Sequence, residues 1–177
     1  MTYVIAISNE KGGVAKTTTT YSLGAALAEM GKKILLIDLD PQGNLTLANG
    51  IEPGKAAYTS HDILMTGLKL QDALCQTSTP GMEIVPSSPA LLEAEQHLPM
   101  RTNYAFILSN ALRAENIQYD FVLLDCPPSM GATTFNALTT AELLIVPTQA
   151  EYFSAYALRD MMTLIRRVRR DTNPRLA

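Results

Sequence analysis

The segment Glu10–Thr18 has residue types and spacing that suit the binding of a triphosphate. It reads Glu-Lys-Gly-Gly-Val-Ala-Lys-Thr-Thr, follows a short apolar run and precedes a helical pattern. A glycine-bearing loop between a strand and a helix directs backbone N–H groups at phosphate oxygens, and the N-terminal end of the helix adds positive charge. Lys16 could reach the β- and γ-phosphates, and the Thr17 hydroxyl could bind Mg²⁺. The predicted nucleotide-binding residues are Lys11, Gly12, Gly13, Val14, Ala15, Lys16, Thr17 and Thr18.

Lys11 distinguishes this loop from the ordinary pattern G-x-x-x-x-G-K-[ST]. Aligned on Lys16, the first glycine of that pattern is replaced by Glu10 and the last by Ala15, whose backbone must tolerate a Cβ. The remaining residues, Lys-Gly-Gly-Val-x-Lys-Thr-Thr, resemble the deviant Walker A loop of the ParA/MinD family of ATPases. In that family the extra lysine crosses an ATP-bound homodimer to contact the partner's phosphates, so the resemblance implies a catalytic role in trans for Lys11. A glycine-rich turn with two surface lysines is the simpler alternative.

Three aspartates follow two other predicted strands, where they would lie beside the phosphate loop. Asp38 ends the run 34–38, Asp40 follows in the next loop, and Asp125 ends the run 121–125. Carboxylates at the ends of parallel strands, next to a phosphate loop, can hold Mg²⁺ directly or through its waters. Asp40 lies on a loop bounded by proline and glycine that could move, which also suits the positioning of a water molecule.

The same aspartates lie in segments that resemble the ParA/MinD family. Residues 38–44 read Asp-Leu-Asp-Pro-Gln-Gly-Asn, similar to its switch I, and residues 125–129 read Asp-Cys-Pro-Pro-Ser, similar to its Walker B strand and the start of switch II. The resemblance implies that Asp40 orients the attacking water, that Asp125 supports Mg²⁺ through a water, and that Asp38 braces the site. Turn formation by Asp40 and a purely structural role for Asp38 stay open as alternatives.

Apolar runs alternate with helical patterns along the 177 residues, of which 47% are hydrophobic and 18% charged. Runs rich in Val, Ile and Leu on both faces suit a parallel sheet that helices cover. We therefore predict an α/β protein with a doubly wound, mostly parallel sheet flanked by helices, and the resemblance implies a P-loop NTPase fold of the SIMIBI type. The predicted strands are residues 4–8, 34–38, 83–86, 121–125 and 143–147, and the predicted helices are residues 17–30, 90–97, 103–115 and 154–170.

The resemblance extends over residues 2–176, so residues 1–177 are expected to form a single P-loop ATPase domain. Residues 147–152 are similar to a family stretch beside the nucleotide and the dimer interface, and residues 173–176 also match a family segment. Family members usually continue into another strand, whose polar end reads the adenine, and into further helices. The chain is therefore expected to lack these C-terminal elements, with residues 143–147 as an exposed apolar edge of the sheet.

The net charge of −3 conceals a basic C-terminal segment. Residues 159–175 hold six of the eight arginines and two aspartates, a local charge of +4, which leaves −7 for the rest of the chain. The predicted helix 154–170 has an apolar stripe along one face. Four arginines lie mainly off this stripe: Arg159, Arg166, Arg167 and Arg170. They could form a solvated face that complements the helix C-terminus, or a surface that neutralises DNA phosphates without sequence preference. The resemblance implies non-specific DNA binding.

Several function classes do not suit the sequence. No apolar run approaches the roughly 20 residues that a membrane-spanning helix needs, and the chain starts directly with a strand pattern, so no membrane association and a cytoplasmic location are expected. The resemblance to the ParA/MinD family implies association with the nucleoid. Cys75 and Cys126 form neither a disulfide framework nor a C-x-x-C site, and they do not match the bridging cysteines of an iron–sulfur electron donor. Isolated His61 and His97 do not indicate a metal site.

The leading hypothesis is a ParA-type partition ATPase, which hydrolyses ATP to ADP and phosphate with Mg²⁺ and acts with a ParB-like partner on DNA. Turnover is expected to be slow without that partner, because the nucleotide state is itself the signal. A MinD-like ATPase that cycles on membranes would need a C-terminal amphipathic helix, which is not found here. Ligases of the dethiobiotin or cobyrinate type lack a lysine equivalent to Lys11. A nucleotide-binding module without hydrolysis also stays open.

Overall fold

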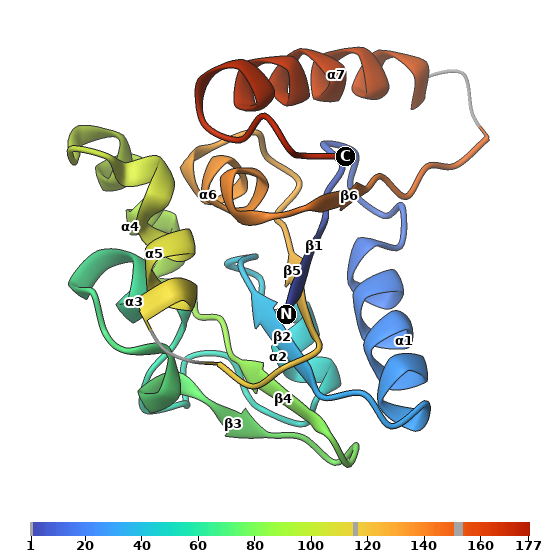
Figure 1. Cartoon of the computed structure of the whole chain (residues 1–177), viewed down its shortest axis with the longest axis vertical. Coiled ribbons are helices and arrows are strands. Elements are labelled where there is room, and N and C mark those ends of the chain that lie inside the picture. Colours follow the sequence, from blue (N-terminus) through green and yellow to red (C-terminus); the bar gives the residue numbers. More distant parts are fainter. Residues whose placement is uncertain (1, 115–116, 151–153) are drawn as a thin grey trace.

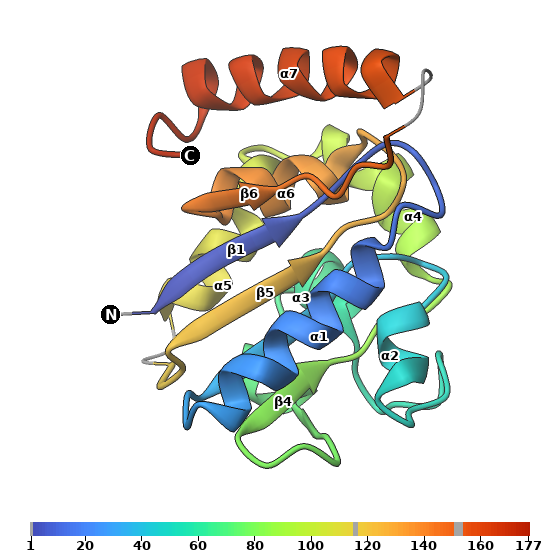
Figure 2. The same ribbon diagram turned by 90° about the vertical axis from the view of Figure 1, so that its right-hand side faces the viewer.

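The described residues of this computed structural model, 2–114, 117–150 and 154–177, form a six-stranded sheet with the order β3-β4-β2-β5-β1-β6. Helices lie on both faces: α1 and α2 cover one, and α3, α5 and α6 cover the other (Figures 1 and 2). The strands are β1 (Tyr3–Ile7), β2 (Ile34–Asp38), β3 (Cys75–Gln76), β4 (Met82–Val85), β5 (Phe121–Asp125) and β6 (Leu143–Ile145). The helices are α1 (Lys16–Glu29), α2 (Asn44–Ala48), α3 (Ser60–Thr66), α4 (Leu91–His97), α5 (Ile107–Ala114), α6 (Ala132–Thr140) and α7 (Ser154–Asp171), with 3₁₀ turns η1 (Leu70–Ala73), η2 (Leu98–Met100) and η3 (Tyr104–Phe106).

Every strand pair except β3·β4 is parallel, which confirms the predicted mostly parallel, doubly wound sheet. Successive strand residues point to opposite faces. Ile5 and Ile7 therefore enter the core under α1, whereas Val4 and Ala6 enter the core under α3 to α6. Because β1, β2 and β5 run in the same direction, their carboxyl ends meet at one edge of the sheet, as the prediction for the site requires.

The structure also contains elements that the sequence patterns did not predict: α2, α3, α6 and the short β3. Eight of the nine residues of α6 are buried, so this helix shows no polar face that could reveal a helical period. The strands and helices that were predicted agree with the structure to within a few residues. The predicted helix 103–115 is divided into η3 and α5, and its last residue lies outside the described residues.

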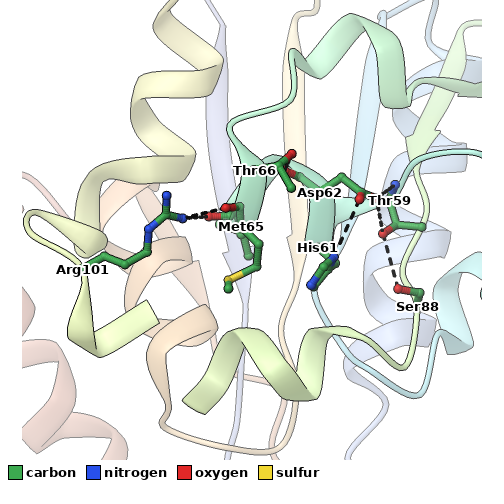
Figure 3. Close-up of polar contacts among 8 residues, drawn as sticks. Thr59, His61, Asp62, Met65, Thr66, Ser88 and Arg101 are labelled. Atoms are coloured by element: carbon green, nitrogen blue, oxygen red, sulfur yellow. Dashed lines mark hydrogen bonds and ion pairs between the residues drawn. The ribbon is translucent and has the colours of Figure 1, made fainter. Parts of the chain in front are cut away.

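The short helix α3 is fixed at both ends (Figure 3). At its start, the Asp62 carboxylate accepts hydrogen bonds from the N–H (2.8 Å) and hydroxyl (3.0 Å) of Thr59, which is one half of a capping box. At its end, one guanidinium nitrogen of Arg101 donates to the carbonyl oxygens of Leu64 and Met65, each at 2.9 Å. These contacts hold both ends of α3 in place.

The strand β6 forms one edge of the sheet, and its three residues are half-buried. The chain returns to this edge after α7: Ala177 N–H donates to the carbonyl oxygen of Glu142, and Leu144 N–H donates to that of Ala177, both at 2.9 Å. No helix in the described part of the chain is long and apolar enough to cross a membrane.

Candidate functional site

The phosphate-loop residues connect β1 to α1 and leave the outer side of the loop open. Gly13 has a φ of +74° and Ala15, the residue before α1, has a φ of 66°. Glycine adopts this left-handed region without strain, whereas a residue with a Cβ loses about 1–2 kcal/mol there. A Cβ added to Gly12 or Gly13 would meet no heavy atom within 4 Å. The loop thus faces open space at both glycines, and the methyl group of Ala15 cannot cap the first N–H groups of α1.

Lys16 and Thr17, at the start of α1, meet Asp125 at the end of β5. Thr17 Oγ1 donates to Asp125 Oδ2 (2.7 Å), and Thr20 Oγ1 donates to Asp125 Oδ1 (3.1 Å). Lys16 is buried, and its Nζ donates to the carbonyl oxygen of Lys11 (3.2 Å). Burial lowers the pKa of Lys16, and the charge of nearby Asp125 opposes this effect. Thr20 was not predicted, although its position four residues after Lys16 places it on the same helix face.

Asp38 holds the loop that carries Asp40. Its Oδ2 accepts hydrogen bonds from the N–H (2.8 Å) and hydroxyl (2.7 Å) of Thr46, and its Oδ1 accepts the N–H of Asp40 (3.1 Å). The Ser87 hydroxyl, from the segment after β4, donates to the carbonyl oxygen of Asp40 (2.5 Å). These contacts agree with a bracing role for Asp38. Thr46 and Ser87 were not predicted, because their contacts depend on how distant elements pack.

Asp38 and Asp125 are register partners on adjacent strands, and both are buried. Burial raises the pKa of Asp38 to about 6 and the pKa of Asp125 to about 7, and the neighbouring charge of Asp38 adds to the effect on Asp125. The described residues contain no group of three His, Cys, Asp or Glu side chains that could hold a metal ion. Mg²⁺ keeps several waters and takes substrate phosphates as ligands, so Thr17 and Asp125 together fit it as a donor set.

The Lys11 side chain contacts Gln149, which lies in the segment after β6. Its Nζ donates to Gln149 Oε1, and Gln149 Nε2 donates to the carbonyl oxygen of Gly13, both at 3.2 Å. Gln149 therefore contacts both the Lys11 side chain and the backbone of the phosphate loop.

A second link joins the loop to the segment after β6. Asn9 Oδ1 accepts the N–H of Lys11 (3.0 Å), and Asn9 Nδ2 donates to the carbonyl oxygen of Pro147 (2.7 Å). The predicted stretch 147–152 thus begins beside the phosphate loop, while its residues 151 and 152 lie outside the described residues. Asn9 gave no signal in the sequence, because a single asparagine before a glycine-rich loop is common in turns.

Comparison with known proteins decides the family. A family model described as an AAA domain matches residues 2–177. The chain is 39% identical to the sporulation initiation inhibitor protein Soj of Bacillus subtilis, over 96% of this chain and 67% of that protein. It is 43% identical to the chromosome partitioning protein ParA of Caulobacter vibrioides, over 98% of this chain and 66% of that protein. The chain belongs to the ParA/MinD family of P-loop ATPases.

Solved structures show the same relationship for this ParA/MinD-family chain. A structure from Mycobacterium smegmatis, described as cobyrinic acid a,c-diamide synthase with bound ADP and magnesium, has a TM-score of 0.95 and 43% identity. It matches 99% of this chain and 71% of its own. The chain thus spans about two thirds of the length of the curated relatives described above.

The arginines of α7 are only partly engaged in this ParA/MinD-family structure. The apolar stripe predicted for this helix packs inward, and α7 lies over α6 (Figure 2). Arg167 stacks over the Phe135 ring at 5.2 Å, and Arg170 forms an ion pair with Asp171 at 2.6 Å. Arg159 lies 3.8 Å from Asp160, and Arg166 is exposed. All four arginines are exposed, and Arg167 in addition packs against α6.

We expect Asp125→Asn to raise the melting temperature of the nucleotide-free, metal-free protein by about 3–6 °C at pH 7.5, as a gain of about 1–2 kcal/mol would do. The pKa of Asp125, about 7, lies above the value of about 3.9 in an unfolded chain, so the folded state binds more protons between these values. Its contribution to stability is complete below about pH 4 and is lost as the pH rises through about 7.

Thermal unfolding from pH 5 to 8 in EDTA measures this effect, with exposed Asp72→Asn as the control. The wild type should lose stability across this range more steeply than Asp125→Asn. If the melting temperatures of the two proteins changed equally with pH, the buried carboxylate would not destabilise the protein as expected.

Proposed function

We propose that this chain is the phosphate-binding and switch part of a ParA-type ATPase, which hydrolyses ATP with Mg²⁺ in a homodimer. The observation that carries the proposal is that Lys16, Thr17 and Asp125 lie close together beneath the phosphate loop. A second lysine, Lys11, lies at the exposed surface of the same loop. The named relatives ParA and Soj support the partition role.

In this mechanism, water attacks the γ-phosphorus, and the bond between that phosphorus and the bridging oxygen of ADP breaks. Backbone N–H groups of residues 12–18 hold the phosphates, and Lys16 offsets charge on the β- and γ-oxygens. Thr17 and Asp125 would hold Mg²⁺, Asp125 through a water, and the ion neutralises phosphate charge when bound. The Asp40 carboxylate aligns the attacking water and accepts its proton. The Asp38 contacts keep Asp40 in place.

Lys11 acts on the partner's nucleotide in the ATP-bound dimer. Its side chain contacts Gln149 of its own chain, so it must change partners when the dimer forms. Hydrolysis then depends on dimerisation, and turnover stays slow until a ParB-like partner favours the reacting state. The dimer works in the cytoplasm, associated with the nucleoid, and positions a chromosome region, a plasmid or another cargo.

We expect Arg166→Ala/Arg170→Ala to weaken non-specific duplex binding of the ATP-bound protein several-fold. The salt slope should fall by about 1 for each arginine that no longer neutralises a DNA phosphate. Both arginines lie on the exposed side of α7. Binding titrations at several salt concentrations, on two unrelated duplexes, measure the effect. Arg113→Ala, which removes an exposed arginine from α5, is the control. If the salt slope of the double variant did not change, these two arginines would not contact DNA and would only form a solvated face of α7.

A second candidate function follows from the M. smegmatis structure, whose description names cobyrinic acid a,c-diamide synthase. Such a protein would use ATP to activate a small carboxylate. The Lys11-type residue, which ligases of this kind lack, favours the partition ATPase.

ATP hydrolysis by the purified chain, with and without duplex DNA, together with sizing in ATP, tests the proposed function. An ATP-dependent dimer whose hydrolysis responds to DNA supports it. ATP consumption only in the presence of a small carboxylate would favour the second candidate. Nucleotide binding without dimer or turnover would mean a binding module.

A further inference from the structure

The helix α6 begins with a cap that another helix supplies. Glu95, on α4, accepts the N–H of Ala132 with Oε2 (2.7 Å) and the N–H of Thr133 with Oε1 (3.1 Å), and the Thr133 hydroxyl also donates to it. The residue before α6, Gly131, has no side chain that could do this. The first N–H groups of a helix need acceptors, and a carboxylate also complements the positive end of the helix dipole.

Gly131 makes room for this carboxylate. A Cβ on Gly131 would overlap Glu95 Oε2, so the carboxylate would have to leave its place at the start of α6. The backbone angles of Gly131, φ −86° and ψ −161°, lie in a region open to residues with a side chain. The glycine is therefore needed for space rather than for backbone freedom, so Gly131 and Glu95 fit each other as a pair.

The helix that carries Glu95 is tied to the Asp40 loop at its other end. Just before α4, the Ser87 hydroxyl donates to the carbonyl oxygen of Asp40 (2.5 Å), and the Ser87 N–H donates to Thr46 Oγ1 (2.8 Å). The next residue, Ser88, lies 3.4 Å from the Thr59 hydroxyl at the start of α3 (Figure 3). Residues 86–97 therefore contact the loop after β2 at one end and the start of α6 at the other.

The loop after β5, residues 126–131, connects Asp125 to α6. Asp125 fixes the start of this loop through its hydrogen bonds from Thr17 and Thr20. Its end is fixed by the Glu95 cap, and the Thr134 hydroxyl donates to the carbonyl oxygen of Ser129 within it (2.7 Å). The end of the loop that leads into α6 thus depends on α4.

We propose that Glu95 is a positioning residue for the loop 126–131, and that residues 86–97 couple this loop to the loop of Asp40. The proposal rests on the proposed function, in which both loops surround the γ-phosphate of ATP. When one loop rearranges around the phosphate, α4 transmits the change to the other, so the water-aligning carboxylate and the Asp125 loop reach their working positions together.

Glu95→Gln tests the positioning role, because it keeps the shape of the side chain but leaves one acceptor oxygen where there were two. We expect kcat for ATP to fall about five- to tenfold while KM changes less than about twofold, since Glu95 does not contact the phosphate loop. Glu93→Gln, which removes an exposed carboxylate from the same helix, is the control and should match the wild type. A lower melting temperature with unchanged kcat would reduce Glu95 to a structural cap and overturn the proposal.

Gly131→Ala supplies a second, independent test. In the wild type the new methyl group would displace the Glu95 carboxylate, so kcat should fall as it does in Glu95→Gln. In Glu95→Ala the space is already free, so adding Gly131→Ala should lower kcat no further. Additive losses in the double variant would show that the two residues act separately.

Hydrogen exchange tests the coupling without relying on ATPase activity. In Glu95→Gln, the amides of Ala132 and Thr133 should exchange faster. So should the amide of Thr46 on α2, which donates to Asp38 at the end of β2 and whose hydroxyl accepts the Ser87 N–H. Faster exchange confined to α6 would contradict the coupling. An inactive wild type with this exchange pattern would mean that the proposed function has failed while the mechanical link between the loops stands.

Discussion

Lys11→Ala should abolish the ATP-dependent dimer and lower ATP hydrolysis by about 10³-fold or more, while the monomer binds ATP within about threefold of the wild type. The magnitude is that of the arginine fingers that stabilise phosphoryl transfer in other nucleotide hydrolases. The reason lies in the different positions of the two lysines. Lys16 is buried beneath the loop, with Asp125 nearby, whereas the Lys11 side chain lies at the loop surface against Gln149.

Lys16→Ala should give the opposite pattern, with loss of ATP binding by the monomer. Binding titrations with a fluorescent ATP analogue, sizing in ATP and steady-state hydrolysis separate the two variants. Lys32→Ala, an exposed lysine just after α1, is the control for removal of a positive charge. An equal loss of monomer binding in Lys11→Ala and Lys16→Ala would rule out the trans role of Lys11.

The contact between Lys11 and Gln149 adds a condition that the sequence did not show. In the single chain Lys11 donates to Gln149, and Gln149 donates to the loop carbonyl of Gly13. Dimer formation must exchange the first of these bonds for a phosphate contact in the partner site. A hydrogen bond at an exposed position has a small net free energy, about 0.5–1.5 kcal/mol, so this contact can orient Lys11 without preventing its release.

The residues proposed to bind phosphate and Mg²⁺ could be located from the sequence because each lies in a short, local pattern. Lys16 and Thr17 follow a strand and glycines, and Asp38 and Asp125 end runs of buried residues, so their positions require only that the strands are parallel. The residues that hold them in place were not predictable. Thr46, Ser87, Glu95 and Asn9 act across elements, and a single polar residue carries no sign of its distant partner.

The helix α6 illustrates the same limit for the fold. It reads Ala-Thr-Thr-Phe-Asn-Ala-Leu-Thr-Thr, with no stripe that separates apolar from polar residues. Its threonines are buried and bond to other groups, as Thr133 bonds to Glu95 and Thr140 bonds to the carbonyl oxygen of Asn136. The sheet and α7 bury it from both sides, so its helical conformation is determined by packing rather than by amphipathic period.

Asp40→Ala should leave ATP binding and the ATP-dependent dimer intact and lower hydrolysis by about 10²- to 10⁴-fold, the usual contribution of a positioned general base. Asp40 Oδ1 accepts the N–H of Gln42 (2.9 Å), which orients the carboxylate and leaves Oδ2 to accept from water. Without this carboxylate the loop loses the bond from Gln42, but Ser87 and Asp38 still hold its backbone. The variant should therefore accumulate as an ATP-bound dimer that stays on DNA.

Sizing in ATP, followed by dilution into ADP, measures this trapped state, and exposed Asp72→Asn is the control for loss of a carboxylate. Asp40→Asn, which keeps the shape of the side chain, should be as inactive as Asp40→Ala, because an amide cannot take a proton from water. Asp38→Asn should differ from both. It replaces the acceptor for two N–H groups and a hydroxyl, so it should loosen the loop and weaken the dimer as well as hydrolysis. If Asp40→Ala also lost the dimer, Asp40 would be a structural residue of the loop, and the role in aligning water would pass to another group.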